Sequence, residues 1–243
     1  MQKTTLPVKP DSKYIQNMFN RLAARYDLFN HLTSFGLASL WRREVLSSIQ
    51  PGMRVLDLGC GTGDLALEAV QRLKGIGEVV GLDFSENMLS FAQKRYEKTG
   101  LNGSHKIRWV LKKAEELPIE NELYDLVVSG FVLRNLYQNI DLILKGVYRS
   151  LKPGGQISFL DITEPQKKWV GALWKFYMNS LTGVCGKILF GKDYPLFYLT
   201  ESARRFLNAV EFSKKLGEAG FQDVRVKSRL FGIITIYQAR TSI

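Results

Sequence analysis

Residues 55–64 read VLDLGCGTGD, in which a short apolar run leads into three glycines at alternate positions. The apolar run at 53–58 is typical of a buried parallel strand, and the spacing of apolar residues over 64–74 predicts an amphipathic helix. A strand, a glycine turn and a helix in this order form the binding edge of many open α/β sheets. The stretch therefore predicts a parallel sheet and a ligand that approaches the backbone closely.

The spacing of the glycines separates the candidate ligands. A dinucleotide site needs a third glycine three residues after the second; here Gly59 and Gly61 fit, but that place holds Asp64. The Gly-Lys-Ser/Thr ending of a phosphate-binding loop is also missing from the stretch. A carboxylate at the start of a helix would compete with a bound pyrophosphate. The pattern favours a ligand without phosphate.

Two other acids fit such a ligand. Asp57 precedes the first glycine, where its charge suits a cationic group, and Asp83 closes the next strand-like run at 78–83. A carboxylate at the end of that strand can accept hydrogen bonds from both hydroxyls of a ribose. The alternative is a tight turn with a helix-capping aspartate. That alternative explains the glycines but not an acid at the next strand end.

The rest of the chain alternates strand-like and helix-like segments. After 78–83 we expect a helix at 85–99, strands at 106–111 and 124–129, a helix at 139–151, a turn at LKPGG (151–155) and a strand at 156–162. Strands that alternate with helices imply βαβ units. The predicted fold class is therefore α/β, with a doubly wound and mostly parallel sheet.

The chain is expected to end differently. A helix near 208–219 is followed by strand-like runs at 222–230 and 233–240, which only a hairpin-length connection separates. Such a connection makes the last two strands antiparallel, which gives seven strands in all. We expect one domain over 1–243, with a helical cap at 11–50 and a helical insertion at 166–206, both near the carboxyl ends of the strands.

Composition limits the partners and the location. The 243 residues include 34 basic and 23 acidic side chains, a formal net charge of +11, which favours anionic surroundings. Two cysteines and two histidines without metal-ligand spacing predict no zinc site and no disulfide scaffold. The chain starts without a signal-peptide pattern and has no apolar run long enough to span a bilayer. We expect a cytoplasmic protein, either soluble or peripheral at the inner face of the membrane.

The pattern D-x-G-x-G-x-G from Asp57 to Gly63 resembles the first motif of class I S-adenosylmethionine-dependent methyltransferases, which have a Rossmann-like fold. The resemblance implies S-adenosyl-L-methionine as cofactor, a cation that carries no phosphate. The positions that the resemblance assigns to cofactor binding are Asp57, Gly59, Gly61, Thr62, Gly63, Asp83, Lys113, Ala114, Ser129 and Gly130.

A more specific resemblance covers most of the chain. YDLFNHLTSFGLASLWRR (26–43), AEELP (114–118), LRN (133–135) and YLTES (198–202) resemble, in order and spacing, the ubiquinone/menaquinone biosynthesis C-methyltransferase family. The resemblance implies methyl transfer to a ring carbon of a polyprenylated quinol. Demethylmenaquinol is the first candidate, and a benzoquinol of the ubiquinone pathway is the second.

The expected chemistry needs particular side chains. A ring carbon becomes nucleophilic when an adjacent hydroxyl ionises, so the site needs a proton acceptor, a cation and accurate placement. Arg134 would stabilise the phenolate and Asn135 would orient the ring, while Tyr26 shares a helical face with Asn30 and would close over the cofactor. His31 is an alternative proton acceptor. The structural alternatives are a solvated Arg134 and a Tyr26 that only packs in the core.

Several alternatives stay open. Lys113 stands where the family usually has Asp or Asn, Gly130 stands where many members have Ser, and 203–209 departs from the family pattern, which puts the substrate in doubt. Another phenol or lipid is therefore a rival substrate, whereas RNA is disfavoured and no nucleic-acid partner is expected. A non-catalytic subunit is a further rival. The aromatic segment 169–190 is a helical cap or an apolar lid that rests on an anionic membrane surface. The sequence leaves open whether the protein forms a homodimer.

Overall fold

The computed structural model describes residues 12–101, 106–119, 121, 123–163, 165, 167–191, 194, 202 and 206–243. Its strands are β1 (Arg54–Leu58), β2 (Glu78–Asp83), β3 (Ile107–Leu111), β4 (Tyr124–Gly130), β5 (Leu151–Ile162), β6 (Gln222–Arg229) and β7 (Ile234–Arg240). Its helices are α1 (Ser12–Thr33), α2 (Leu37–Val45), α3 (Asp64–Arg72), α4 (Glu86–Lys98), α5 (Leu133–Leu136), α6 (Ile140–Ser150), α7 (Lys168–Tyr177), α8 (Gly183–Phe190) and α10 (Ala209–Glu218).

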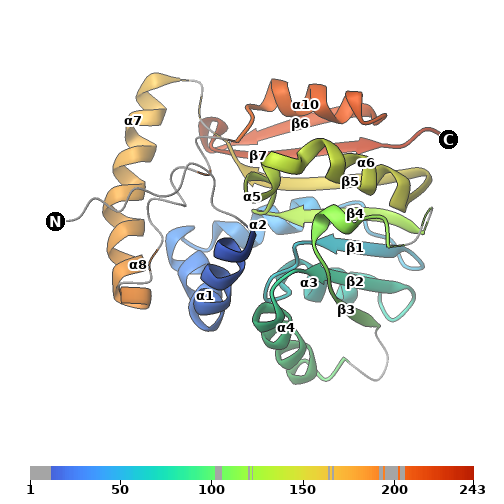
Figure 1. Cartoon of the computed structure of the whole chain (residues 1–243), viewed down its shortest axis with the longest axis horizontal. Helices are drawn as coiled ribbons and strands as arrows, with labels where there is room; N and C mark the ends of the chain where they lie inside the picture. Colours follow the sequence, from blue (N-terminus) through green and yellow to red (C-terminus); the bar gives the residue numbers. More distant parts are fainter. Residues whose placement is uncertain are drawn as a thin grey trace.

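The seven strands form one sheet in the order β3-β2-β1-β4-β5-β7-β6 (Figure 1). The first five strands are parallel, whereas β7 pairs antiparallel with both β5 and β6. The strand order reverses between β1 and β4, which is the place where open α/β sheets bind ligands. The predicted doubly wound sheet with an antiparallel C-terminal hairpin is confirmed.

Local sequence signals explain where two helices begin. The Ser85 side chain accepts a hydrogen bond from the Met88 N–H (3.2 Å) at the start of α4, and Asn208 accepts from the N–H groups of Val210 and Glu211 at the start of α10. These two residues are caps, because they satisfy helix N–H groups that have no partner within the helix. The predicted helices at 85–99 and 208–219 therefore each begin one residue early.

The predicted turn at LKPGG is different in the structure, where 151–155 is the first part of β5. The pairing with β4 shifts register there, from Tyr124 opposite Leu151 to Leu126 opposite Gln156. Gly154 has a φ of 73°, which an L side chain rarely adopts. The segment is thus an irregular strand start rather than a separate turn, because its backbone still pairs with neighbouring strands.

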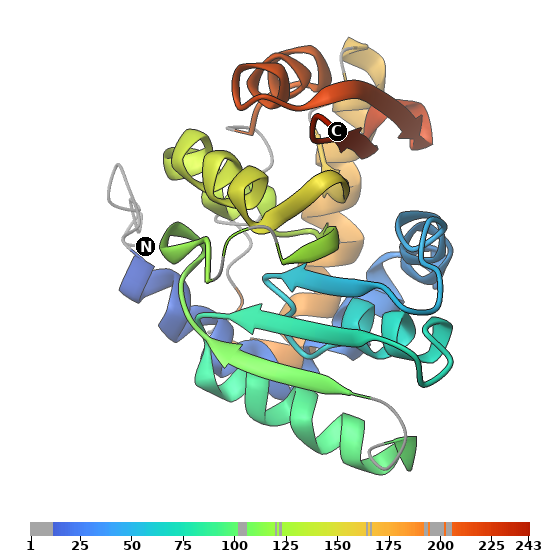
Figure 2. The ribbon, with the colours of Figure 1, turned by 90° about the vertical axis from the view of Figure 1, so that its right-hand side faces the viewer.

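Helices cover both faces of the sheet (Figure 2). One apolar core lies between the sheet and helices α6 and α10, and includes Leu144, Phe212 and Tyr237. The other lies between the sheet and helices α2 and α3, and includes Val45 and Val70. Both cores are built from residues that are almost fully buried, so burial of apolar area fixes the strand order and register.

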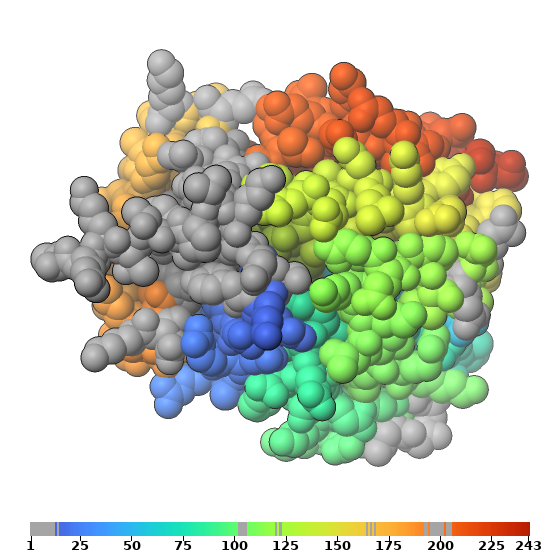
Figure 3. Space-filling view, in the orientation of Figure 1, coloured from blue at the N-terminus to red at the C-terminus, as the bar shows by residue number. Residues whose placement is uncertain are grey.

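The predicted helical cap and the described part of the predicted insertion lie together. Helix α1 contacts α4 on one side and α8 on the other (Figure 3). Helices α7 and α8 run on from each other through a π-helical stretch (Met178–Thr182). Most of YLTES (198–202), most of 191–206 and residue 11 lie outside the described residues. No helix that the structure describes is long and apolar enough to cross a membrane.

Candidate active site

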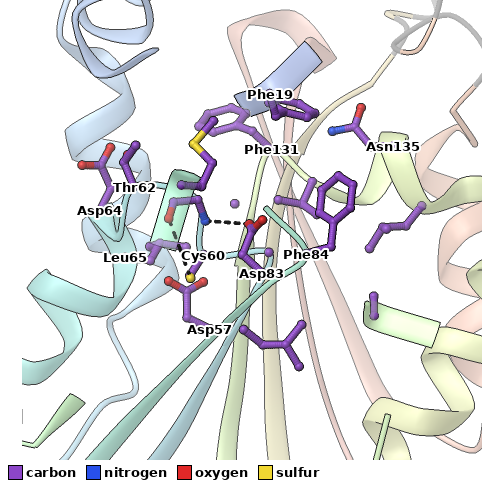
Figure 4. A pocket seen from close by; sticks show the side chains of 18 of the residues that line it. Phe19, Asp57, Cys60, Thr62, Asp64, Leu65, Asp83, Phe84, Phe131 and Asn135 are labelled. Atoms are coloured by element: carbon purple, nitrogen blue, oxygen red, sulfur yellow. Dashed lines mark hydrogen bonds between the residues drawn. The ribbon is translucent and has the colours of Figure 1, made fainter. Parts of the chain in front are cut away.

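A cavity of about 140 Å³ lies at the carboxyl ends of β1, β2 and β4, with α1 on one side (Figure 4). It contains most of the residues predicted to bind the cofactor. Those that line it are Asp57, Gly59, Gly61, Thr62, Asp83, Lys113, Ala114 and Gly130, together with Tyr26 and Asn135. We call it the donor cavity. Eight of the ten residues predicted to bind the cofactor therefore line one cavity.

Gly59, Gly61 and Gly63 of the loop have different structural roles. All have positive φ (70°, 52° and 87°), a backbone region that favours glycine. A Cβ on Gly59 would lie 2.5 Å from the Val132 side chain, whereas one on Gly61 would meet nothing within 4 Å and so faces the open cavity. Gly63 does not line the cavity; a Cβ there would press on Trp109 and Ala92. Gly63 thus permits close packing of the loop.

Asp57 is the clearest sign of a cationic ligand. Its side chain is buried, and neither carboxylate oxygen has a hydrogen-bond partner among the described residues. Burial raises the pKa of Asp57 to about 8, and the nearby Ala66 backbone N–H, whose geometry falls short of a hydrogen bond, offsets this only in part. A buried carboxyl without a partner is costly unless a ligand supplies one. The ammonium group of S-adenosylmethionine fits this position.

Asp83 holds the loop and faces the same cavity. Its two oxygens accept hydrogen bonds from the N–H groups of Gly61 and Ser85, both at 2.9 Å. Burial nevertheless raises the pKa of Asp83 above its usual value. A carboxylate has about four acceptor positions, so Asp83 retains capacity for the hydroxyls of a ligand. The predicted role toward a ribose agrees with this geometry.

The remaining predicted cofactor residues differ in position. Lys113 and Ala114 line the donor cavity at the start of a short 3₁₀ helix, and Gly130 lines it from the end of β4. Ser129 does not line it, because its buried hydroxyl donates a hydrogen bond to the Leu58 carbonyl (2.7 Å) within the sheet. Adjacent strand residues face opposite sides, so only one of Ser129 and Gly130 can face the cavity. The sequence did not show which of the two does.

A second cavity, of about 440 Å³, lies beside the first. We call it the acceptor cavity. Its wall comes from α1, α2, α7, the end of β4 and the connection before β7, and it is mostly aromatic and aliphatic. Among the described residues that line it, Arg134 is the only charged one. Tyr26, Asn30 and Phe131 line both cavities, so they form the boundary between the two.

Tyr26 lies at this boundary and also packs in the core. Its ring contacts Phe19 edge-on, with centroids 5.9 Å apart. Burial raises the pKa of Tyr26, although the Arg134 charge and a hydrogen bond with Asn30 act in the opposite direction. The hydroxyl is therefore neutral near pH 7. Both readings of Tyr26 from the sequence agree with its position.

Arg134 is buried rather than solvated. It lies on α5, and its Nη1 donates to the Asp161 carboxylate (2.7 Å) and to the Phe131 carbonyl (2.8 Å). Asp161, at the end of β5, also accepts a hydrogen bond from the Arg134 N–H (2.9 Å). Asp161 was not predicted from the sequence, although an acid inside the apolar run SFLDI is a signal of such a role. A paired guanidinium is fixed in one orientation, which suits recognition of an anion.

Neither Asn135 nor His31 lines the cavity that Arg134 lines. Asn135 lines the donor cavity, whereas Arg134 lines the acceptor cavity (Figure 4). His31 is exposed and lines neither cavity, so its proposed role as proton acceptor is not supported by its position. Consecutive helical residues point in directions about 100° apart, which explains the separation of Arg134 from Asn135.

A polar network ties α1 to the glycine loop. The Thr62 hydroxyl donates to Asp27 of α1, and Arg95 of α4 donates to Asp27 (2.8 Å), to the Thr62 carbonyl (2.9 Å) and to Asp64 (2.8 Å). Arg42 pairs with Asp64 from α2 (3.0 Å). The sequence analysis missed Asp27, Arg95 and Arg42, because contacts between distant helices leave no local pattern.

Sequence relatives decide the class of enzyme. The profile of the ubiE/COQ5 methyltransferase family matches residues 8–241. This chain belongs to that family. A demethylmenaquinone methyltransferase of Geobacillus kaustophilus is 34% identical over 226 residues, covering 92% of this chain and 94% of that protein. A ubiquinone/menaquinone biosynthesis C-methyltransferase, UbiE, of Pseudoalteromonas translucida is 30% identical over 236 residues, covering 96% and 93%.

Solved structures agree on the fold. The [4+2]-cyclase SpnF has a TM-score of 0.68 at 17% identity and covers 99% of this chain and all of its own. A SAM-dependent methyltransferase of Thermotoga maritima has a TM-score of 0.64 at 19% identity, covering 94% of this chain and all of its own. Likenesses at this identity show the fold alone. Family membership confirms the predicted methyltransferase activity and S-adenosylmethionine as methyl donor.

Proposed function

We propose that this member of the ubiE/COQ5 family transfers a methyl group from S-adenosylmethionine to a ring carbon of a polyprenylated quinol, with demethylmenaquinol as the first candidate. The single observation that carries this proposal is the pair of adjacent cavities that share Tyr26, Asn30 and Phe131. One holds buried carboxyl groups among side chains of both charges, and the other has a mostly apolar wall. Relatives named for demethylmenaquinone methylation support the choice of substrate. A benzoquinol of the ubiquinone pathway is the second candidate, and the UbiE relative supports it.

The donor cavity would hold the cofactor through its acids. Asp57 would pair with the ammonium group and Asp83 would accept from the ribose hydroxyls, while Gly61 leaves room for the ligand. The bound cofactor supplies an electrophilic methyl on a positively charged sulfur. The polar network through Asp27 and Arg95 keeps α1 against the glycine loop, which limits the access of water.

The acceptor cavity would prepare the ring. Its apolar wall would take the isoprenoid tail, and the guanidinium of Arg134 would stabilise the phenolate that makes the ring carbon nucleophilic. The Asp161 carboxylate keeps Arg134 in place. Tyr26 and Asn30 lie where donor and acceptor meet, so they would orient the ring toward the donor.

The residues that line the acceptor cavity favour some of the rival substrates over others. RNA is disfavoured because an RNA site needs a cationic surface, and the acceptor cavity has a single charged residue, Arg134, among those described. Another phenol or lipid with an apolar tail fits the same wall and is the remaining alternative. A polyprenylated quinol is a membrane lipid, so we also propose, as a separate point, a peripheral contact of the protein with an anionic membrane surface. A homodimer is left open, as it was by the sequence.

One assay tests the proposal. The pure protein is incubated with cofactor labelled at the methyl group and with reduced demethylated naphthoquinols, reduced benzoquinols and total RNA in separate reactions. We expect label in the naphthoquinol first, bonded to a ring carbon. Label only in RNA, or in no quinol of either ring type, would overturn it.

A further inference from the structure

The outer side of α7 and α8 exposes large apolar side chains. We call this surface the α7–α8 face and define it by Trp169, Leu173, Phe176, Val184 and Ile188, each of which is more than half exposed. Phe176 is 72% exposed and Ile188 is 74% exposed. Single exposed apolar residues are ordinary, but a cluster of them on one pair of helices marks an interaction surface. Figure 1 shows these two helices as a column beside the rest of the molecule.

The charge of the same segment indicates the kind of partner. Residues 167–190 contain four lysines and no acidic residue. Lys175 and Lys187 are exposed and precede Phe176 and Ile188 in the sequence. Apolar side chains flanked by lysine ammonium groups fit the boundary of an anionic bilayer, where rings and aliphatic chains enter the acyl region and ammonium groups meet headgroups. An interface with a second copy is usually poor in lysine, so this composition disfavours one.

The acceptor cavity opens on this surface. Trp169 and Leu173 belong to the α7–α8 face and also line the acceptor cavity. Phe231, which is 72% exposed, lines the cavity too, and its ring lies 5.7 Å from that of Trp169. An apolar wall therefore continues from the face into the cavity, so a lipid tail that follows it stays out of water.

We propose that the α7–α8 face docks on an anionic phospholipid bilayer, and that the quinol enters the acceptor cavity from the bilayer past the contacting rings of Trp169 and Phe231. The identity of the entering molecule rests on the proposed function; the docking does not. Lys175 and Lys187 lie among the exposed apolar side chains of α7 and α8, a composition that suits helices lying in the plane of the interface.

Binding of the full chain to vesicles tests the docking. Sedimentation with vesicles of phosphatidylcholine and phosphatidylglycerol in equal parts is compared with sedimentation with phosphatidylcholine alone. We expect binding to the anionic vesicles that added salt weakens. Ile188→Ser should weaken it about tenfold, because it removes an inserted side chain. The matched control is Ile76→Ser, the same change at an exposed isoleucine before β2, which should leave binding unchanged.

A second pair of variants tests the charge. Lys187→Gln should weaken binding to anionic vesicles about fivefold, whereas Lys98→Gln, at an exposed lysine of α4, should not. Equal effects at Ile188 and Ile76, or at Lys187 and Lys98, would overturn the proposed face. So would sedimentation equilibrium that shows a dimer dissociated by Ile188→Ser, because that result would assign the face to a second copy.

Two substrates separate this inference from the proposed function. Ile188 does not line the acceptor cavity. The Ile188→Ser variant should therefore methylate a short-tailed, water-soluble demethylated quinol as fast as the unchanged protein. With a long-tailed quinol in vesicles, the methylation rate of the same variant should fall by about the factor by which its vesicle binding is weakened. Normal vesicle binding without methylation of any quinol would refute the proposed function alone. Methylation of the short-tailed quinol without vesicle binding would refute the docking alone.

Discussion

The donor cavity and the acceptor cavity are built in opposite ways. The donor cavity is lined by side chains of both charges, and its key residues come from one glycine loop and two neighbouring strand ends. The acceptor cavity is apolar and draws on α1, α2, α7 and the connection before β7, which are far apart in the sequence. The donor site therefore depends on local backbone geometry, and the acceptor site depends on how the added helices pack. Changes at residues that line only one of the cavities should leave ligand binding in the other nearly unaltered.

The largest expected effect is a loss of turnover on removal of the positive charge from the acceptor cavity. Exchange of the buried pair for two amides, with Arg134→Gln and Asp161→Asn together, removes the positive charge without leaving a buried ion unpaired. Loss of the charge that stabilises the phenolate should lower kcat about 10²- to 10³-fold. The dissociation constant for the cofactor should change less than about twofold, because Arg134 does not line the donor cavity. Single-turnover kinetics and calorimetry measure the two quantities.

Asp161 also supplies a control for that experiment. Arg134→Gln alone leaves the fully buried Asp161 carboxylate without its cation, so it should lower the free energy of unfolding by about 3–5 kcal/mol. The double variant should recover much of this loss in a denaturant titration. If the double variant lost cofactor affinity as strongly as turnover, the separation of the two cavities would be wrong.

The next effect is confined to the donor side. Asp83→Ala removes the acceptor for the ribose and also the two hydrogen bonds that fix Gly61 and Ser85. We expect the dissociation constant for the cofactor to rise about 100-fold, since hydrogen bonds to a charged group each contribute about 1.5–3 kcal/mol. The KM for the quinol at saturating cofactor should stay unchanged. A higher quinol KM with unaltered cofactor affinity would reverse the assignment.

Asp57 makes the donor side dependent on pH. Its pKa of about 8 means that the free protein carries this carboxyl protonated at neutral pH. A cationic ligand favours the charged form, so binding should release a proton and tighten by up to about tenfold per unit as the pH rises toward 8, then level off. Calorimetry in two buffers of different ionisation enthalpy counts the released proton. Asp57→Asn should abolish the release and flatten the profile.

The same carboxyl has a consequence for stability. Because folding raises its pKa above the ordinary value of 3.8, the charged form is less favourable in the folded protein than in the unfolded one. Its contribution to the free energy of unfolding therefore falls as the pH rises from about 4 to about 8 and is constant above that. Asp57→Asn should remove this part of the pH dependence. An unchanged slope in denaturant titrations would show that other groups cause it.

The contrast between the cavities also explains what the sequence could predict. Asp57, Gly59, Gly61 and Asp83 follow from short patterns at strand ends, where local geometry determines direction. The mostly parallel sheet and its antiparallel C-terminal hairpin followed from the alternation of strands and helices and from the short connection at Phe231.

The acceptor side was harder to predict. Asp161 and the rim formed by Trp169 and Phe231 depend on contacts between distant elements, which no periodicity records. The same holds for the pair of Asp27 and Arg95. Arg134 was predicted only through the family resemblance, and its burial against Asp161 came from the structure.

The smallest expected effect concerns Lys113, where the family usually has Asp or Asn. Lys113 lines the donor cavity, and its backbone N–H donates to Glu116 (3.1 Å), so a substitution should keep the backbone in place. Lys113→Asn adds an acceptor for the adenine amine and should tighten the cofactor about threefold to tenfold. The matched control is Lys112→Asn, because Lys112 lines the same cavity and the change removes the same charge. Equal tightening in both variants would mean that the lysines only repel a cationic ligand, and the difference between them measures the hydrogen bond to adenine.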